Sequence, residues 1–203
     1  MKKLIRLVLC LVLIGAVLSA VNLYQDRQTL QDSLVRLHVV ANSDSEEDQH
    51  IKLQVKDAIV SFLQPVMEQF PSKEEAMEYI RRNVSAIQEL SNQVLEKLGV
   101  KEKVQVTLAP EAFDVRVYDT FSLPSGVYDA LRVEIGEGKG KNWWCVVFPS
   151  LCLPVSGEGF EAEAVSSGFS ERLTNTISHR GGYRLRFFLL DCVGKLENIF
   201  VFG

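Results

Sequence analysis

The spacing of hydrophobic residues takes three forms along the chain, and each form predicts a different kind of element. Residues 34–41 are mostly apolar and rich in β-branched side chains, which is typical of a buried strand. Apolar positions three and four residues apart in 51–66 and 76–98 predict two amphipathic helices that pack as an antiparallel pair. Over residues 104–148 the period falls to two, which predicts an antiparallel meander. The expected fold class is α+β, a helical pair packed on a mostly antiparallel β-sheet.

Capping residues mark the ends of the two predicted helices. Residues 42–45 read Asn-Ser-Asp-Ser, all of them N-cap types, and three acids follow where the helix dipole favours negative charge. Pro65 should kink or end this first helix at the residue before it. Ser72 and Glu75 form a capping box for the second helix, which should stop before Gly99.

The last part of the chain carries weaker patterns. Residues 168–179 suit a further helix. Residues 183–191 suit either a strand or a helix, and we favour a strand.

A charged and then apolar segment at the N-terminus has the layout of an export signal. Three basic residues precede residues 7–18, a run without any polar side chain. As a helix this run rises only about 18 Å, short of the roughly 30 Å hydrocarbon core of a bilayer. A membrane-spanning helix would therefore have to recruit neighbouring residues up to Leu23. The basic residues are Lys2, Lys3 and Arg6.

Two fates of this segment stay open. Cleavage after Ala20 would leave Leu18 where a small residue is wanted, so the cleavage site is imperfect. We expect residues 1–20 to be a signal peptide or a weak membrane anchor, and we favour removal. Residues 21–33 are then a leader or stalk, and residues 34–203 form a single α+β domain.

Composition and charge narrow the classes of partner. The chain has 203 residues, of which 47% are hydrophobic and 24% charged, and this balance excludes a disordered or many-spanning protein. The formal charge is −4, and setting aside the three basic residues of the N-terminal segment leaves about −7 for the rest. Nucleic acids and anionic membranes require a basic face. We therefore expect no nucleic-acid partner, and membrane contact only through the N-terminal segment.

Two histidines and two aspartates near the first helix start raise the question of a metal or acid–base site. His38, Asp44, Asp48 and His50 lie close together in the sequence. However, Asp44 and Asp48 are already explained as capping and first-turn acids, and His50 lies about 200° around the helix from Asp48. We expect no metal, no cofactor and no catalytic residue. A polar network in which His38 and Arg36 satisfy neighbouring acids is the favoured role.

The glycine-rich segment 136–141 matches a phosphate-binding loop only in composition. Such a loop needs a helix after it and a terminal hydroxyl side chain, whereas here a predicted strand follows and Asn142 stands in the hydroxyl position. We interpret the segment as a flexible hairpin loop. Ser43, Ser45 and Cys145 lack the surroundings of a serine or cysteine nucleophile, so an enzyme is the less favoured class.

The cysteines outside the N-terminal segment are odd in number, which leaves at least one of them without a partner in its own chain. They are Cys145, Cys152 and Cys192. They can be buried thiols that pack as small hydrophobic groups, or a disulfide can join Cys145 to Cys152 or Cys152 to Cys192. None of them has zinc-ligand spacing.

Adjacent tryptophans on a predicted strand offer one candidate for partner contact. Because successive side chains on a strand face opposite sides, one indole belongs to the core and the other suits a binding surface. We take these tryptophans and the polar residues around the first helix start as candidate partner contacts. The full set is Arg36, His38, Asn42, Ser43, Asp44, Asp48, Gln49, Lys52, Trp143 and Trp144.

Two blocks of sequence resemble the stage II sporulation protein R family of endospore-forming bacteria. They are RLHVVANSDSEEDQHIKLQVKDAI at residues 36–59 and NWWCVVFPSLC at residues 142–152. Both blocks are long and stand in the family's order, and with the export segment the resemblance spans nearly the whole chain. Two departures are minor: Lys56 stands where arginine is common in the family, and Ser150 stands where a second proline is common.

The resemblance implies a signalling protein that is made in the forespore and exported into the space between the two membranes of the developing spore. There it would activate a membrane-embedded aspartic protease of the mother cell, which removes the pro-sequence of the early mother-cell sigma factor. The alternative is a secreted hydrolase that acts on the cell wall through a site at His38 and Asp44.

Overall fold

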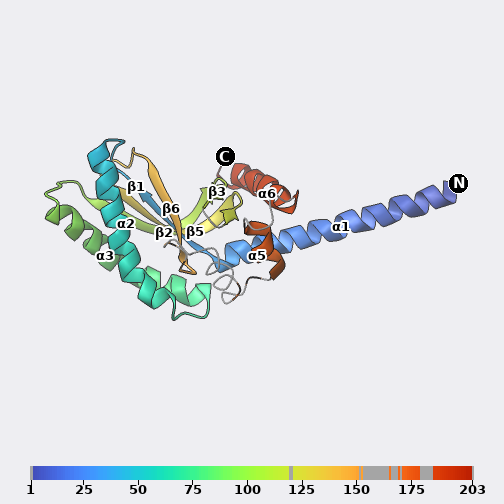
Figure 1. The fold of residues 1–203 in the computed structure, drawn as a ribbon, viewed down its shortest axis with the longest axis horizontal. Helices are drawn as coiled ribbons and strands as arrows, with labels where there is room; N and C mark the ends of the chain where they lie inside the picture. The colour runs from blue at the N-terminus through green and yellow to red at the C-terminus, as the bar shows by residue number, and fades with distance from the viewer. Residues whose placement is uncertain are drawn as a thin grey trace.

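The computed structural model of the chain describes residues 2–118, 121–150, 152, 165, 169, 171–178 and 185–202. A helical pair covers one face of a mixed sheet, and shorter elements with two further helices cover part of the other face (Figure 1). The helices are α1 (Lys2–Ser33), α2 (Glu46–Met67), α3 (Lys73–Lys97), α5 (Glu171–Ile177) and α6 (Leu185–Phe202). The strands are β1 (Val35–Val40), β2 (Val104–Phe113), β3 (Arg116–Val117), β4 (Ser122–Leu123), β5 (Gly126–Ile135) and β6 (Asn142–Phe148).

β1 lies inside a four-stranded sheet and not beside a separate meander. The strand order is β2-β5-β1-β6, with β1 parallel to β5 and antiparallel to β6. The meander expected over residues 104–148 is therefore wrong in one respect, because β1 separates β5 from β6. All six residues of β1 are buried, as in a strand paired on both edges and covered on both faces. The fold class is α+β with a mostly antiparallel sheet, as predicted.

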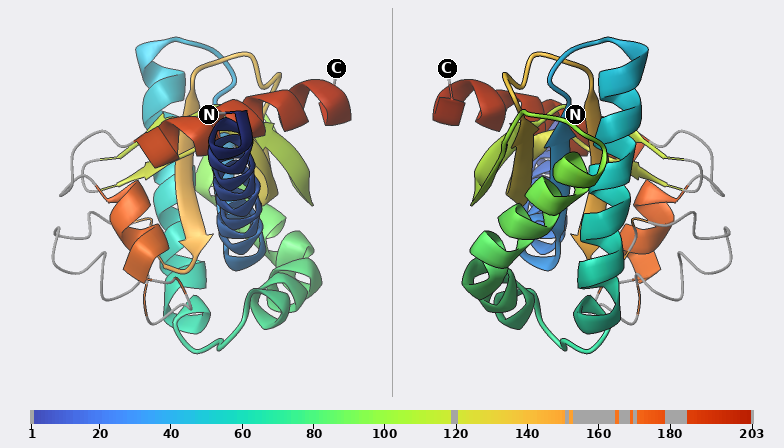
Figure 2. Two further views of the ribbon diagram at one scale, coloured as in Figure 1. Left: turned by 90° about the vertical axis from the view of Figure 1, so that its right-hand side faces the viewer. Right: turned by 90° about the vertical axis from the view of Figure 1, so that its left-hand side faces the viewer.

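The pair α2 and α3 covers one face of the sheet (Figure 2, right). Leu37 and Val39 of β1 point to this side together with Leu131 and Val133 of β5, and all four are completely buried. They pack in one core with Ile59 of α2. The alternating apolar positions of the strands and the three-and-four spacing of the helices meet here, which confirms the predicted helical pair on a sheet.

The other face of the sheet carries a smaller apolar cluster. Leu30 and Leu34, at and just beyond the end of α1, are fully buried there beside Phe113 of β2. The segment 21–33, expected as a leader or stalk, is therefore helical, and its last turns are packed into the domain. Leu30 is in the last turn of α1 and Leu34 directly follows its end, so both enter the apolar cluster where the chain passes from α1 into β1.

The helix ends follow the predicted capping residues with one exception. Ser45 and Ser72 are the N-caps of α2 and α3, and each accepts a hydrogen bond from the backbone amide three residues on (3.1 and 3.3 Å). Gly99 follows the end of α3 with a φ of 73°, the left-handed conformation that glycine tolerates. α2 continues past Pro65 to Met67, because a proline in the last turn removes only one backbone hydrogen bond.

Of the two elements predicted for the C-terminal part of the chain, the helix is confirmed and the strand is wrong. The strand favoured at residues 183–191 is wrong from Leu185 onward, where α6 begins, while residues 183 and 184 lie outside the described residues. A short apolar run cannot be assigned to strand or helix by periodicity alone. The helix expected at 168–179 is confirmed over α5, and residues 168, 170 and 179 lie outside the described residues.

Candidate functional site

The loop from β1 into α2 is held by hydrogen bonds among its own residues. Ser43 Oγ donates to Asp48 Oδ2 (2.5 Å), and Asn42 Nδ2 donates to the same oxygen (3.0 Å). The hydrogen bond from Ser43 is the largest cause of a lowered pKa at Asp48. Gln49 Nε2 closes the loop by donating to the Ser43 carbonyl oxygen (2.8 Å).

The glycine-rich loop 136–141 wraps around the end of β1. Four of its backbone amides donate to residues 41–44, so the loop carries the chain from β5 over β1 to β6. The expected β-hairpin loop is therefore wrong. The bonds are Glu137 N to Asn42 Oδ1 (3.0 Å), Lys139 N to Asn42 O (3.2 Å), Gly140 N to Ala41 O (2.9 Å) and Lys141 N to Asp44 Oδ1 (2.7 Å). We call residues 41–52 together with 136–141 the β1-end cluster.

Asp44 and Lys52 tie this cluster together. Asp44 accepts from the loop amide of Lys141, so it does not cap α2, a role that Ser45 takes. Lys52 is only 5% exposed, and its Nζ donates to Gln49 Oε1 (2.6 Å) and to the Lys141 carbonyl oxygen (3.1 Å). Burial lowers the pKa of Lys52. Six of the candidate contacts thus share one site: Asn42, Ser43, Asp44, Asp48, Gln49 and Lys52.

Gly140→Ala should destabilise the β1-end cluster. An alanine Cβ would lie 2.1 Å from the Ser43 carbonyl oxygen, so the backbone of the loop must move and lose hydrogen bonds. We expect a loss of about 2–3 kcal/mol in the free energy of unfolding, measured by urea denaturation. Gly99→Ala is the control, because its Cβ meets nothing within 4 Å and costs only about 1 kcal/mol for the left-handed backbone. Equal losses in the two variants would contradict the close approach.

A second group of polar residues lies on the sheet face opposite α2 and α3. His38 of β1 stacks on Trp144 of β6, with 3.7 Å between ring centroids, and its Nδ1 lies 2.8 Å from Glu111 Oε1 of β2. Arg132 of β5 donates to Glu111 Oε1 (2.6 Å) and to Glu134 Oε1 (2.7 Å). We call these five residues the His38 cluster.

The His38 cluster holds the half-buried carboxylate of Glu111 in its ionised form. Burial alone would raise the pKa of Glu111, but the hydrogen bonds and charges of His38 and Arg132 outweigh it and lower the pKa. Within the described part of the chain, His38 Nε2 and Glu111 Oε2 are buried without a hydrogen-bond partner. The cluster is therefore an electrostatically coupled site that keeps spare hydrogen-bonding capacity.

The free energy of unfolding should depend on Glu111 in acid. Because its pKa is lowered in the folded state, its contribution is complete above the ordinary glutamate pKa of about 4.3 and is lost as the pH falls below that value. Glu111→Gln removes the contribution, so the difference in stability between the parent and the variant should shrink on acidification. Urea unfolding from about pH 6 to about pH 3 measures this difference, and a constant value would contradict the proposed coupling.

Arg36 occupies an aromatic site. It is completely buried, and its guanidinium lies 3.8 Å from the centroid of Phe113 and 5.1 Å from that of Tyr128. Its Nη2 donates to the Tyr118 hydroxyl (3.0 Å). No ion pair with Arg36 occurs among the described residues, so the expected acid partner is found for His38 and not for Arg36. Its contacts are cation–π in character.

The two tryptophans face opposite sides of β6, as predicted. Trp143 packs at the margin of the core under α2, with Lys56 Nζ 4.8 Å from its ring centroid. Trp144 lies on the other face, with the guanidinium of Arg116 4.5 Å from its ring centroid. Both indoles are half-buried, so neither is a purely internal side chain.

His38 and Asp44, the pair required by the hydrolase alternative, bind to different elements. His38 contacts Glu111 on the sheet face, whereas Asp44 is bonded to Lys141 in the β1-end cluster. Two hollows on the described surface, of about 470 and 400 Å³, lie along α3 and are lined by neither residue. Among the described residues, no group of three His, Cys, Asp or Glu is placed to hold a metal.

A disulfide joins Cys145 of β6 to Cys152, seven residues later. Of the open alternatives for the cysteines, the structure therefore selects this bridge, which suits an oxidising compartment. Cys192 on α6 is free and half-buried, and Cys10 on α1 is free and exposed.

Several charged residues that lie on the His38 side of the sheet are not among the contacts predicted from the sequence. They are Glu111, Arg116, Arg132 and Glu134. All four lie in residues 104–148, for which the sequence pattern predicts strands and no site. Their meeting with His38 depends on the pairing of β1 with β5, in which His38 lies opposite Arg132. A local pattern does not specify such a pairing.

Two comparisons with known proteins agree. The family model of stage II sporulation protein R matches residues 31–157. The stage II sporulation protein R of Bacillus subtilis (strain 168) is 32% identical over 185 residues, which cover 82% of this chain and 83% of the relative. The chain belongs to the stage II sporulation protein R family. No solved structure matches it.

Family membership confirms the resemblance and gives the chain a role in sporulation. The segment matched by the family model begins in the last turn of α1 and extends past β6. It therefore contains both the β1-end cluster and the His38 cluster, while α5 and α6 lie beyond it.

Proposed function

We propose that this chain is an exported signal that activates the membrane-embedded aspartic protease of the mother cell, which then removes the pro-sequence of the early mother-cell sigma factor. The observation that carries the proposal is membership of the stage II sporulation protein R family, because the resemblance to that family implies this role. In this account the domain acts by binding and is not itself an enzyme.

The N-terminal helix supports the export step. α1 is long and apolar enough to cross a membrane by length and composition, and Lys3 and Arg6 lie at its N-terminal end. Basic residues beside an apolar helix stay on the cytoplasmic side of a membrane, so the domain at the other end of α1 would leave the forespore cytoplasm. This holds whether the segment is later cleaved or remains as an anchor.

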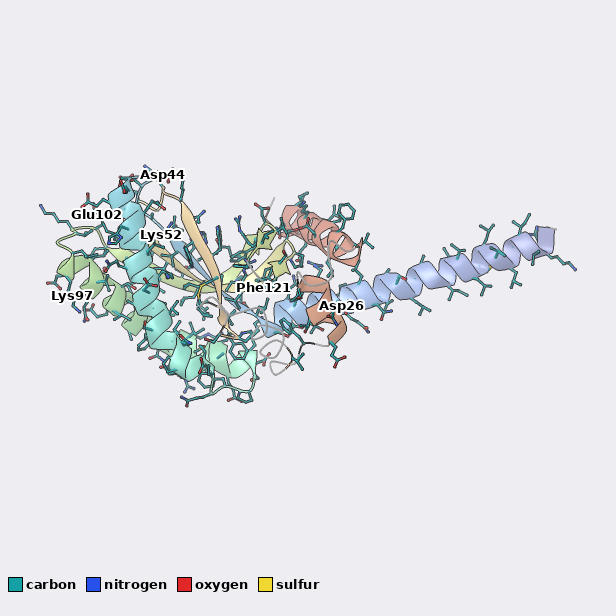
Figure 3. The ribbon with its side chains drawn as sticks, viewed as in Figure 1. Asp26, Asp44, Lys52, Lys97, Glu102 and Phe121 are labelled. Atoms are coloured by element: carbon teal, nitrogen blue, oxygen red, sulfur yellow. A yellow bond between two sulfur atoms is a disulfide. The ribbon has the colours of Figure 1, made fainter. Side chains whose placement is uncertain are left out.

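The β1-end cluster is the surface that we assign to the protease. Asp44, Glu46, Glu47 and His50 are exposed on it, and internal hydrogen bonds fix the loop that carries them. A fixed loop loses little conformational entropy on binding. Asp44 lies at the end of the domain away from the N-terminus of α1, so α1 in the forespore membrane would direct this end toward the mother-cell membrane (Figure 3).

Activation then needs only a difference in affinity between two states of the protease. A ligand that binds the active conformation more tightly shifts the population toward it. Moving the population from about 1% to about 99% active requires roughly 10⁴-fold tighter binding to the active conformation. A smaller preference gives partial activation, so loss of one contact should reduce the signal in a graded way.

Asp44→Ala tests the assigned surface. We expect it to lose one hydrogen bond, about 1 kcal/mol of stability, and most of the signal. The measurement is conversion of the pro-sigma factor in cells that co-express the chain, the protease and the substrate. Glu89→Ala is the control, because Glu89 is an exposed acid on α3 that should leave processing unchanged.

Two results would oppose this assignment. Full processing with Asp44→Ala would remove the β1-end cluster from the contact surface. A fall in processing that only follows a fall in folded protein would make the role of Asp44 structural.

A further inference from the structure

α6 is apolar on two opposite faces, and only one of them is packed. Its exposed apolar side chains fall within an arc of about 100° at 100° per residue, so they form one stripe along the helix. The stripe consists of Phe188, Leu189, Leu196 and Ile199, which are 45%, 42%, 56% and 64% exposed. Large apolar side chains gathered on one exposed face mark a surface that something covers.

The opposite face of α6 is held firmly by the domain. Leu190 is completely buried, and Asp191 Oδ1 accepts hydrogen bonds from the amide (3.0 Å) and hydroxyl (2.6 Å) of Ser125. A Cβ at Gly194 would lie 1.5 Å from the Ser125 carbonyl oxygen, so the helix and this turn are in close contact. The exposed stripe is therefore fixed in place and cannot rotate into the core.

α6 lies beside the helix that can cross a membrane. Glu197 of α6 forms an ion pair with Arg27 of α1 and accepts a hydrogen bond from Gln31 Nε2 (2.8 Å). α6 runs crosswise to α1 on the side of the domain from which α1 leaves (Figure 2, left). A membrane crossed by α1 would therefore lie roughly parallel to α6.

The position of α6 along α1 matches the boundary between the headgroups and the acyl chains of that membrane. Leu23 ends the stretch needed to span the bilayer, and Arg27 follows it four residues later, about 6 Å along the helix. The headgroup layer on each side of a bilayer is also about 6 Å thick. Because a helix with its side chains is about 10 Å across, the outer stripe of a helix tied to Arg27 reaches the acyl boundary.

We propose that α6 is an interfacial membrane helix, whose exposed stripe inserts into the outer leaflet of the membrane that α1 enters. The proposal rests on the export step of the proposed function and not on the protease. It replaces the expectation that only the N-terminal segment contacts the membrane. It also keeps the domain at the membrane if residues 1–20 are removed, because α6 provides a second point of attachment.

Fluorescence of a label on the stripe tests this in the full chain. The environment-sensitive dye NBD is attached through Leu196→Cys, in a chain with Cys10→Ser and Cys192→Ser, and the protein is inserted into vesicles of phosphatidylethanolamine and phosphatidylglycerol. A control label at Leu98→Cys sits at the end of α3, near Lys97 and far from α1 (Figure 3). We expect a blue-shifted emission at position 196 only, with strong quenching by doxyl lipids and little by aqueous iodide.

A second variant keeps the result independent of folding. Adding Leu189→Asp and Ile199→Asp to the labelled chain should return the emission to that of the control and restore quenching by iodide, while circular dichroism shows unchanged helix content. The proposal would be overturned if, without the two aspartate substitutions, the label at position 196 had the same emission as the control label at position 98. It would also be overturned by a blue shift that appears only when the protease is present in the vesicles, since the stripe would then bind protein and not lipid.

Discussion

Deletion of residues 2–20 is expected to abolish processing of the pro-sigma factor while leaving a folded domain inside the producing cell. The domain should fold because the deletion stops short of Leu30 and Leu34, the fully buried residues with which the end of α1 enters the apolar cluster. Signalling should be lost because the basic and apolar segment that directs export is gone. Immunoblots of fractionated sporulating cells measure both the location of the domain and the conversion of the substrate.

The control restores export without restoring the sequence. Replacing residues 1–20 with an unrelated cleavable signal peptide should return processing to near the parent level, because α1 residues beyond the deletion still pack on the domain. Processing by the deleted form at the parent rate would show that the chain acts from the forespore cytoplasm, and the export step would be wrong.

Arg36→Ala should cost about 3 kcal/mol in the free energy of unfolding, the usual size of a large-to-small change in a core. The side chain is completely buried among Phe113, Tyr128 and Tyr118, and alanine leaves a cavity between the rings. Arg36→Met should be close to neutral, because it fills most of the volume and removes a charge whose burial is itself costly. Thermal and urea unfolding of the two variants measure these effects.

The comparison of the two variants separates packing from charge. If Arg36→Met loses as much stability as Arg36→Ala, the positive charge over the rings is what stabilises the site. If both variants are neutral, the aromatic site collapses around the smaller side chain and the packing account fails.

The sequence predicts the elements of this fold better than their arrangement. The buried strand, the two helices and their serine caps follow from local spacing and capping chemistry, and the structure confirms them. The place of β1 between β5 and β6 does not follow from any local pattern. It depends on long-range pairings such as that of Val39 with Val133, which nothing in the sequence of either segment indicates.

The candidate sites show the same division. The β1-end cluster was partly predictable, because its cap residues and its glycine-rich loop are each visible in sequence. Their contact was not, because it requires the loop to cross the end of β1. For the His38 cluster, the sequence predicts only a histidine near acidic residues. The carboxylate that His38 contacts is that of Glu111, 73 positions away, and not that of Asp44.

The helical state of α6 does not follow from its sequence for a related reason. Apolar residues crowd its N-terminal half, and such runs suit a strand or a helix equally well. In the structure one face packs on the turn before β5, and the other face stays exposed. An apolar helix with one exposed apolar face is recognised only once its packing is known.

The most direct test of the central claim is the rate of pro-sigma factor cleavage by the purified protease in vesicles, with the domain added to the outer side. The account predicts a saturable rise of about tenfold or more, since couplings between binding sites are commonly 5- to 150-fold. It also predicts that Asp44→Ala added in the same way gives a smaller rise. A cleavage rate that does not change with saturating domain would contradict the account.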